Sequence, residues 1–126
     1  MKILLTLFVL FFTSSVFSET FYCSENNAVG FDGRNNYKQV DIEPIKFEAV
    51  IDFRNFKFIA NDIYIDSNDI CLDGKNNTMR CSNGIGTSII INKQNFNFVY
   101  SSGFGHVHNK INEDDLIFSY GRCYKN

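Results

Sequence analysis

The sequence predicts an all-β domain, an antiparallel meander of about eight strands that forms a small barrel or sandwich stapled by two disulfides. Two observations carry this prediction. After residue 18, apolar and polar residues alternate with a period of two, and no stretch shows sustained helical periodicity. The cysteines near the two ends of this region can join its first and last strands. Strands that follow one another without helices between them are typical of an antiparallel meander.

The first 18 residues have the features of a signal peptide. Lys2 supplies a positive start, residues 3–12 form an apolar run broken only by Thr6, and residues 16–18 (VFS) provide a cleavage site. The apolar run is too short to span a bilayer. We therefore expect a signal peptide over 1–18 and a single all-β domain over 19–126, exported to the periplasm or the extracellular space.

Each strand has its own justification in the pattern. Residues 45–53 alternate with a period of two, which predicts one buried and one mostly polar face, with Val50 on the latter. At 60–61 the apolar phase slips, which indicates a bulge or a break between strands. The run Ile89-Ile90-Ile91 predicts a strand covered on both faces. The expected strands are residues 21–24, 45–53, 56–58, 63–65, 70–72, 79–82, 87–92, 96–100 and 116–120.

Two segments of the chain predict similar β-hairpins. Residues 52–58 (DFRNFKF) resemble residues 92–98 (NKQNFNF), with a turn-forming pair in the middle of each. Clusters of Gly, Asn and Asp separate the other strands, as expected for tight turns. The likeness is too short to define a repeat, so it supports only a shared local structure.

The four cysteines allow three pairings. Cys71 and Cys81 flank a turn-rich segment, so they can face each other across a hairpin. Cys23 and Cys123 then join the first and last strands, which become neighbours when a meander closes. The rival interpretation, metal ligands or a nucleophile, is opposed by the wide spacing and by the absence of any Cys-x-x-Cys.

Charge and composition exclude several function classes. With 12 basic and 14 acidic residues the chain is mildly acidic, so it lacks the electrostatic footprint of a nucleic-acid-binding protein. The sequence lacks the basic cluster that attaches proteins to anionic lipid. We therefore expect no stable membrane insertion after the leader is removed. Abundant Asn, Ile, Phe and Lys indicate codon bias in an AT-rich genome, which favours a bacterial source.

The candidate catalytic residues are few. His106 and His108 would point to the same side of an extended segment and could bind a divalent metal with Glu113, Asp114 or Asp115. The glycines and asparagines around them are more typical of an exposed loop. We therefore assign no catalytic, metal or cofactor-binding residue, and the histidine site is kept only as a metal-dependent enzyme alternative.

Other motifs fail on spacing. Residues 100–104 do not form the Gly-x-Ser-x-Gly of a nucleophile elbow. The acidic segment 66–74 lacks an oxygen ligand at Ile70 and a closing Glu, so it is not a calcium loop. The glycines at 84 and 86 precede a strand instead of a phosphate-binding helix.

The chain resembles an uncharacterised family of short exported proteins from AT-rich marine bacteria. The matching segments cover both ends and one hairpin of the expected domain, in the same order, and the family brings no known activity. They are residues 21–25 (FYCSE), 30–32 (GFD), 51–53 (IDF) and 120–123 (YGRC).

The plan of the chain is also similar to that of bacterial periplasmic inhibitors of C-type lysozyme, small β-barrels with a disulfide between the N- and C-terminal regions. Cys23 and Cys123 agree with that plan. The recognition segment of those inhibitors contains Ser and Gly followed by Tyr. Residues 82–84 (SNG) are its nearest counterpart here and lack the Tyr. The similarity implies an inhibitor as one kind of binding protein.

Taken together, the sequence predicts an exported, monomeric, non-catalytic binding module for a protein or small-molecule partner. We expect its surface at loop 101–114 and the turns over 26–38. One alternative is a periplasmic carrier with a ligand cavity lined by Phe47, Ile51 and Phe98. The other is the metal-dependent enzyme at the two histidines.

Overall fold

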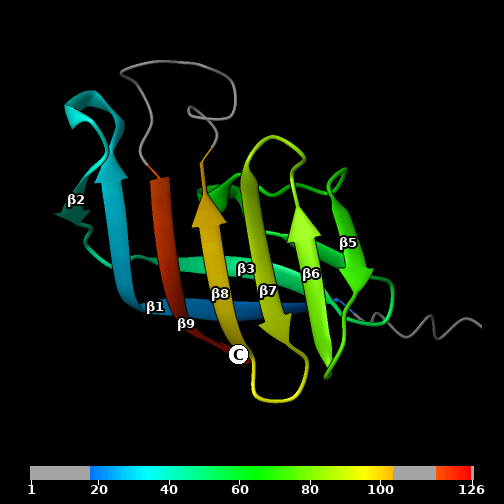
Figure 1. Ribbon diagram of the computed structural model, residues 1–126. Helices are drawn as coiled ribbons and strands as arrows, with labels where there is room; N and C mark the ends of the chain where they lie inside the picture. The colour runs from blue at the N-terminus through cyan, green and yellow to red at the C-terminus, as the bar shows by residue number, and fades with distance from the viewer. Residues whose placement is uncertain (1–17, 104–115, 126) are drawn as a thin grey trace, which may run out of the picture.

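The computed structural model describes residues 18–103 and 116–125, and these form an antiparallel β-structure (Figure 1). The predicted all-β class and the meander are confirmed. Two short 3-10 turns, η1 (Gly33–Asn35) and η2 (Asn61–Ile63), interrupt the strands. The strands are β1 (Glu19–Asp32), β2 (Lys38–Asp41), β3 (Lys46–Asp52), β4 (Lys57–Ile59), β5 (Ile70–Asp73), β6 (Thr78–Ser82), β7 (Thr87–Asn92), β8 (Asn97–Ser102) and β9 (Leu116–Lys125).

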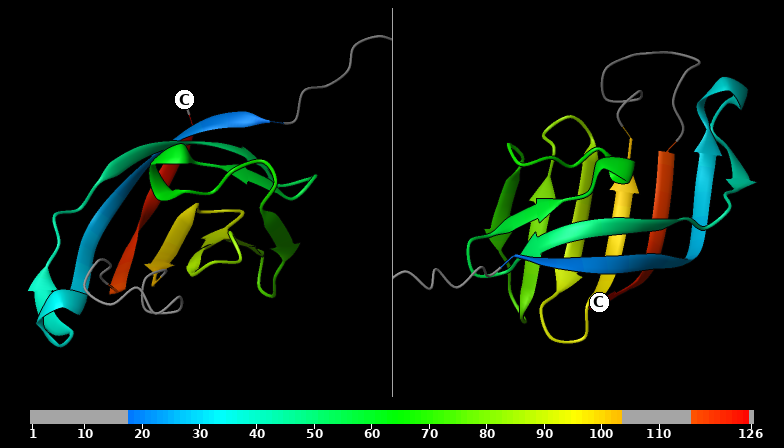
Figure 2. Two further views of the ribbon diagram at one scale, coloured as in Figure 1. Left: turned by 90° about the horizontal axis from the view of Figure 1, so that it is seen from above. Right: turned by 180° about the vertical axis from the view of Figure 1, so that it is seen from behind.

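The strands pair in the order β4-β3-β1-β9-β8-β7-β6-β5, with β2 paired to the second half of β1. β1 is the longest strand and bends at a β-bulge between Glu25 and Asn27. Before the bulge it pairs with β3, and along most of its length it pairs with β9. Figure 2 shows β3 and the first half of β1 crossing the other strands at a steep angle. The bulge thus folds one sheet over itself, as strand bends do in orthogonal β-packings.

The core lies between the two layers made by this bend. Inward residues alternate along each strand, and Ile89 and Ile91 of β7 are fully buried against the inward side of β3. The barrel is nearly closed, because β4 and β5 share no ladder and the chain between them forms a single bridge, Ala60 to Ile65. The side chains of Ile63 and Ile65 fill the core behind this seam.

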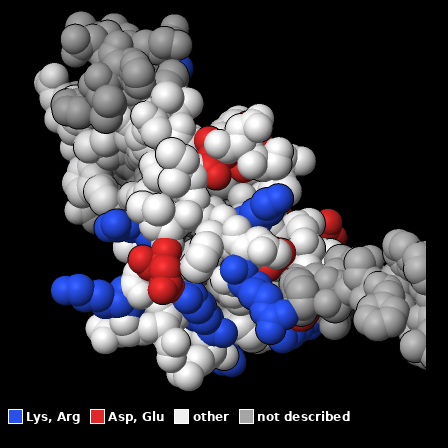
Figure 3. All heavy atoms as spheres, turned by 90° about the vertical axis from the view of Figure 1, so that its right-hand side faces the viewer, with Lys and Arg blue, Asp and Glu red and all other residues white. Residues whose placement is uncertain are grey.

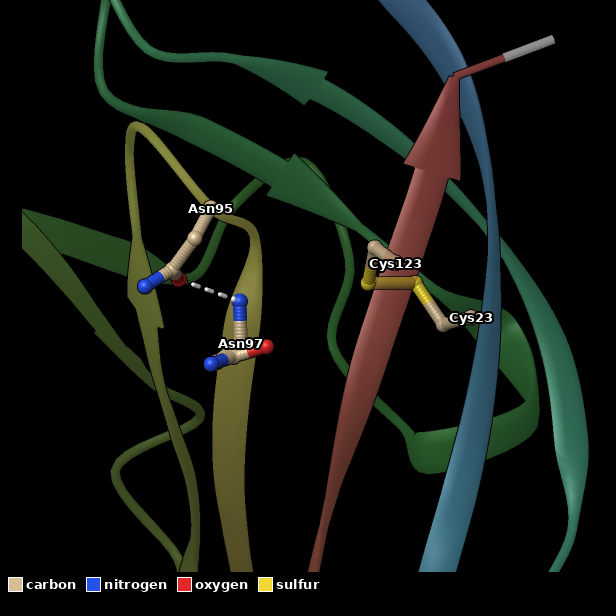
Figure 4. The surroundings of a disulfide bond; sticks show 4 residues. All are labelled: Cys23, Asn95, Asn97 and Cys123. Carbon is tan, nitrogen blue, oxygen red and sulfur yellow. Dashed lines mark hydrogen bonds between the residues drawn. A yellow bond between two sulfur atoms is a disulfide. The ribbon is translucent and has the colours of Figure 1, made fainter.

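Both disulfides link residues that lie directly opposite each other on neighbouring strands. Cys23 of β1 faces Cys123 of β9 with a Cα separation of 3.9 Å, and Cys71 of β5 faces Cys81 of β6 at 4.1 Å. This confirms the pairing favoured by the sequence. Figure 4 shows the first bond joining β1 to β9. The amide of Cys123 also donates to the carbonyl of Phe96, at 3.0 Å, which ties β9 to the β7–β8 turn.

The β3–β4 and β7–β8 hairpins have the same turn, as their sequences predict. Asp52 Oδ1 accepts hydrogen bonds from two backbone amides of its turn at 3.0–3.1 Å, and Asn92 Oδ1 does the same in the second turn at 2.8–3.0 Å. Each turn then places a phenylalanine in the left-handed region, Phe56 at φ 54° and Phe96 at φ 62°. Glycine is the usual residue there, because a side chain makes this conformation costly.

The structure also differs from the expected strands. β1 continues through residues 25–32, and β2 was not expected at all, because polar residues interrupt the alternation in both segments. The phase slip at 60–61 is a 3-10 turn in which Tyr64 adopts φ 59°, so Ile63 and Ile65 are not a strand. Both still face the core. Among the described residues, no helix has the length and apolar character needed to cross a membrane.

The twin turns give a matched pair of substitutions. Phe96→Gly should lower the free energy of unfolding by about 2 kcal/mol, since it removes ring contacts with Phe21 and Phe53, whose centroids lie 5.1 and 6.0 Å away. Phe56→Gly should change it by less than about 1 kcal/mol, because relief of the left-handed phenylalanine offsets the loss of a half-exposed ring. Urea unfolding measures both. Equal losses would contradict the stabilising role assigned to the Phe96 ring contacts.

Asp52 predicts a pH dependence. A hydrogen bond from the Asn55 side chain, with help from turn amides and Lys57, holds the pKa of Asp52 below 3.8, although burial opposes this. Its contribution to stability is therefore present above the ordinary carboxyl pKa and is lost as pH falls through the lowered value. Asp52→Asn should keep the turn, because Asn92 forms the same turn in the second hairpin. Since the variant side chain does not titrate, the difference between the urea midpoints at pH 7 and pH 3 should become smaller. An unchanged difference would exclude this role.

Candidate binding surface

Only some of the sites considered from the sequence lie among the described residues. His106, His108 and the acidic residues after them lie outside the described residues, as does most of loop 101–114. All four cysteines are bonded in pairs. Across 18–103 and 116–125, no group of three or more His, Cys, Asp or Glu could hold a metal ion.

Phe47, Ile51 and Phe98, the expected lining of a ligand cavity, occupy the barrel interior. The rings of Phe47 and Phe98 meet edge to face with centroids 5.6 Å apart, and all three side chains are buried. Such a distance is that of a packed aromatic pair. These side chains therefore pack against one another as part of the core.

A buried carboxylate, that of Glu25, lies at the bend of β1. Glu25 is buried; Ser119 Oγ donates to its Oε1 at 2.9 Å, and the backbone amide of Ile45 donates to its Oε2 at 3.1 Å. The amide of Glu25 in turn donates to the carbonyl of Ile45 at 3.0 Å. Glu25 thus fastens the chain before β3 to the bulge. The carboxylate, the Ser119 hydroxyl and the Ile45 amide together form a clamp at the bend.

Tyr100 lies in the same interior. Burial raises the pKa of its hydroxyl; a hydrogen bond from Ser102 opposes the shift, and the negative charge of Glu25 adds to it. A tyrosine with a raised pKa stays neutral at physiological pH. It therefore serves here as a buried aromatic side chain with a satisfied hydroxyl.

The outside of β9 is very different from its inside. Its outward side chains are Phe118, Tyr120, Arg122 and Tyr124, all exposed, while the inward positions include Ser119, Gly121 and Cys123. The larger apolar residues of this strand are thus on the solvent side. The guanidinium of Arg122 lies over the ring of Tyr124, 5.4 Å from its centroid.

Cross-strand register extends this surface over four more strands. We call the outward side of β5 to β9 the outer face. Tyr120 is paired with Val99, Val99 with Ile90, Ile90 with Arg80 and Arg80 with Leu72, and these five residues form what we call the central row. The four apolar members are each 43–55% exposed. Directly opposed side chains contact one another across a sheet, so the row is continuous.

Two polar rows flank the central row. On one side Ser82, Ser88 and Ser101 are aligned by register, with the hydroxyls of Ser88 and Ser101 3.0 Å apart. On the other side Thr78 is paired with Asn92. Shallow grooves border Tyr120 and Val99 on both sides. The outer face therefore combines exposed apolar groups with neutral hydrogen-bonding groups.

Gly121 keeps this surface in register at the bend. A Cβ atom at position 121 would lie 2.1 Å from the carbonyl oxygen of Ser24 and 2.8 Å from the ring of Phe98. No side chain fits in that space. The glycine therefore lets β9 approach β1 beside the bulge, and it fixes which way Tyr120 and Arg122 point.

The sequence interpretation did not find this surface. Residues 26–32 of the expected turn surface are part of β1, and the Ile89–Ile91 strand is covered on one face only, with Ile90 43% exposed. In β9 the alternating Phe118 and Tyr120 indicated only a strand, with no sign that they faced outward. The odd-numbered position of Cys123 in the alternation of β9 was the available signal. A cysteine bonded inside the barrel places the odd-numbered residues of β9 inward, and so its aromatic residues outward.

The clamp predicts a graded effect at Glu25. Glu25→Ala should lower the free energy of unfolding by about 2–3 kcal/mol, because it leaves the Ile45 amide and the Ser119 hydroxyl without a partner. Glu25→Gln should cost less than about 1 kcal/mol, since the amide can bond both groups. Exposed Glu48→Ala on β3 is the control and should stay within about 0.5 kcal/mol. Urea unfolding measures all three variants. If Glu25→Gln lost as much free energy of unfolding as Glu25→Ala, the clamp would be contradicted.

Comparison of the chain with protein-family models, curated proteins and solved structures gave no match. The function of the outer face is therefore argued from its own chemistry.

Proposed function

We propose that the protein is an exported, non-catalytic binding module that contacts its partner through the outer face. The observation that carries this proposal is the central row, in which Ile90, Val99 and Tyr120 stand exposed side by side on rigid strands. Soluble proteins seldom expose contiguous apolar patches without a use for them. The two disulfides and the leader-like N-terminus support export, because disulfides persist in oxidising compartments.

The residue types on this face are those that dominate binding energies. Tyr, Phe and Arg are enriched at protein interfaces, and a few such residues near the centre provide most of the affinity. Tyr120 has Val99 beside it and Arg122 two residues along the same strand. Tyrosine supplies a large contact area with little rotamer entropy to lose on binding.

The scaffold adds preorganisation. β9 lies between β1 and β8 in the sheet, and the Cys23–Cys123 bond holds it one residue from Tyr124. Side chains on a paired, stapled strand need little ordering when a partner binds, which lowers the cost of association. The filled interior around Phe47 and Phe98 gives the carrier alternative no comparable support.

Site-specific photo-crosslinking tests the proposal. We would place p-benzoylphenylalanine at Tyr120 and, as a matched control, at Tyr64, which is 79% exposed and outside the outer face. Irradiation in the exported fraction of the source cells should link one partner to position 120 and none to position 64. Excess unlabelled protein should compete, whereas excess Val99→Asp protein should not, because a charge in the central row opposes docking.

The proposal fails if position 120 gives no adduct, or the same adducts as position 64. It also fails if the Val99→Asp protein competes as well as the unaltered one. Circular dichroism would first establish that each variant has the thermal midpoint of the parent.

A further inference from the structure

We infer that the partner is an acidic protein segment, which places carboxylates on Arg80 and Arg122 and apolar side chains on Ile90, Val99 and Tyr120 of the central row. This inference rests on the proposed function and names the chemistry of the partner. The first observation is the charge of the outer face. Its outward positions in the five strands are Ile70, Leu72, Thr78, Arg80, Ser82, Ser88, Ile90, Asn92, Asn97, Val99, Ser101, Phe118, Tyr120, Arg122 and Tyr124.

Among these strand positions the only charged side chains are the two arginines; Asp69, in the chain just before β5, borders the groove beside Arg80 without forming an ion pair with it. The whole chain, in contrast, has more acidic than basic residues, 14 against 12. A face with only positive charge on a mildly acidic protein is complementary to negative charge on a partner. Both arginines are exposed.

The second observation is that, among the described residues, the protein does not neutralise these two arginines with ion pairs of its own, as it does for two of its lysines. In the described part of the chain, Lys93 is paired with Asp73, and Lys125 lies 3.5 Å from Glu19. Figure 3, which views the β5 side, shows acidic groups among the Lys and Arg side chains gathered there. Arg80 and Arg122 have no such pairing with a described carboxylate, and the guanidinium of Arg122 lies over the Tyr124 ring. Their planar guanidinium groups remain open to bidentate contacts from outside.

Spacing and surroundings favour a polypeptide over another polyanion. Arg80 is on β6 and Arg122 on β9, three strand spacings or about 14 Å apart across the sheet. Between them lie Ile90 and Val99, aliphatic groups that suit apolar side chains. Nucleic acids need a longer basic track than two arginines provide, although the face does carry aromatic side chains. The serine row can hydrogen-bond to a peptide backbone.

The test uses immobilised poly(Glu,Tyr), a random copolymer that offers carboxylates together with aromatic side chains. Biolayer interferometry at 50 and 200 mM salt should show binding by the intact protein that weakens as salt rises. Arg80→Glu and Arg122→Glu should each reduce affinity at least tenfold. Lys75→Glu makes the same charge change in the β5–β6 turn, away from the outer face, and should reduce it less than twofold. Val99→Asp should abolish binding.

Several results would overturn the inference. Equal losses from Lys75→Glu and Arg122→Glu would mean that only overall charge matters. Equal binding to polyglutamate without tyrosine would remove the central row from recognition. Tighter binding to alginate, a polyuronate, would assign the face to a glycan. If the protein does not bind the copolymer while position 120 still crosslinks a partner, the assignment of an acidic partner is wrong, but the proposed binding function is retained.

Discussion

β1 belongs to both layers of the barrel, and it can do so only because the chain bends at the bulge between Glu25 and Asn27. Everything else is arranged around that bend. The carboxylate of Glu25 fastens the approach to β3, Gly121 lets β9 come close enough to pair, and the Cys23–Cys123 bond locks the two strands just before the bulge. A disulfide that closes so long a loop is worth about 4–5 kcal/mol in the chain-entropy account.

The same bend decides where the binding chemistry lies. Because Cys123 is bonded inside, the inward side of β9 carries Ile117, which packs against the core, and the small residues Ser119 and Gly121, while its aromatic side chains are directed outward. The core does not need them, since Phe47, Phe98 and the inward isoleucines fill it from neighbouring strands. Large apolar residues that the core does not use are available for contact with another molecule.

Local pattern predicted most of the barrel. The alternation of 45–53 predicted β3, the twin DFRNFKF and NKQNFNF segments predicted two hairpins, and the cysteine spacing favoured the observed pairing. What it missed depends on distant contacts. The polar start of residues 25–32 becomes a strand only because β9 and β2 pair with it, and Ile90 is exposed because no layer covers the outer face. The surface itself depends on register between strands, which a single segment does not encode.

The position of β9 has a consequence for the order of folding. The last strand of the described chain lies in the middle of the sheet, between β1 and β8, and not at an edge. Neither layer can be completed until the C-terminal residues are present, and the pairing of the first and last strands closes a long loop, which is slow. Since β9 also carries Tyr120 and Arg122, a chain that has not finished folding has no assembled binding surface. Competence to bind and completion of the fold therefore arise in one step.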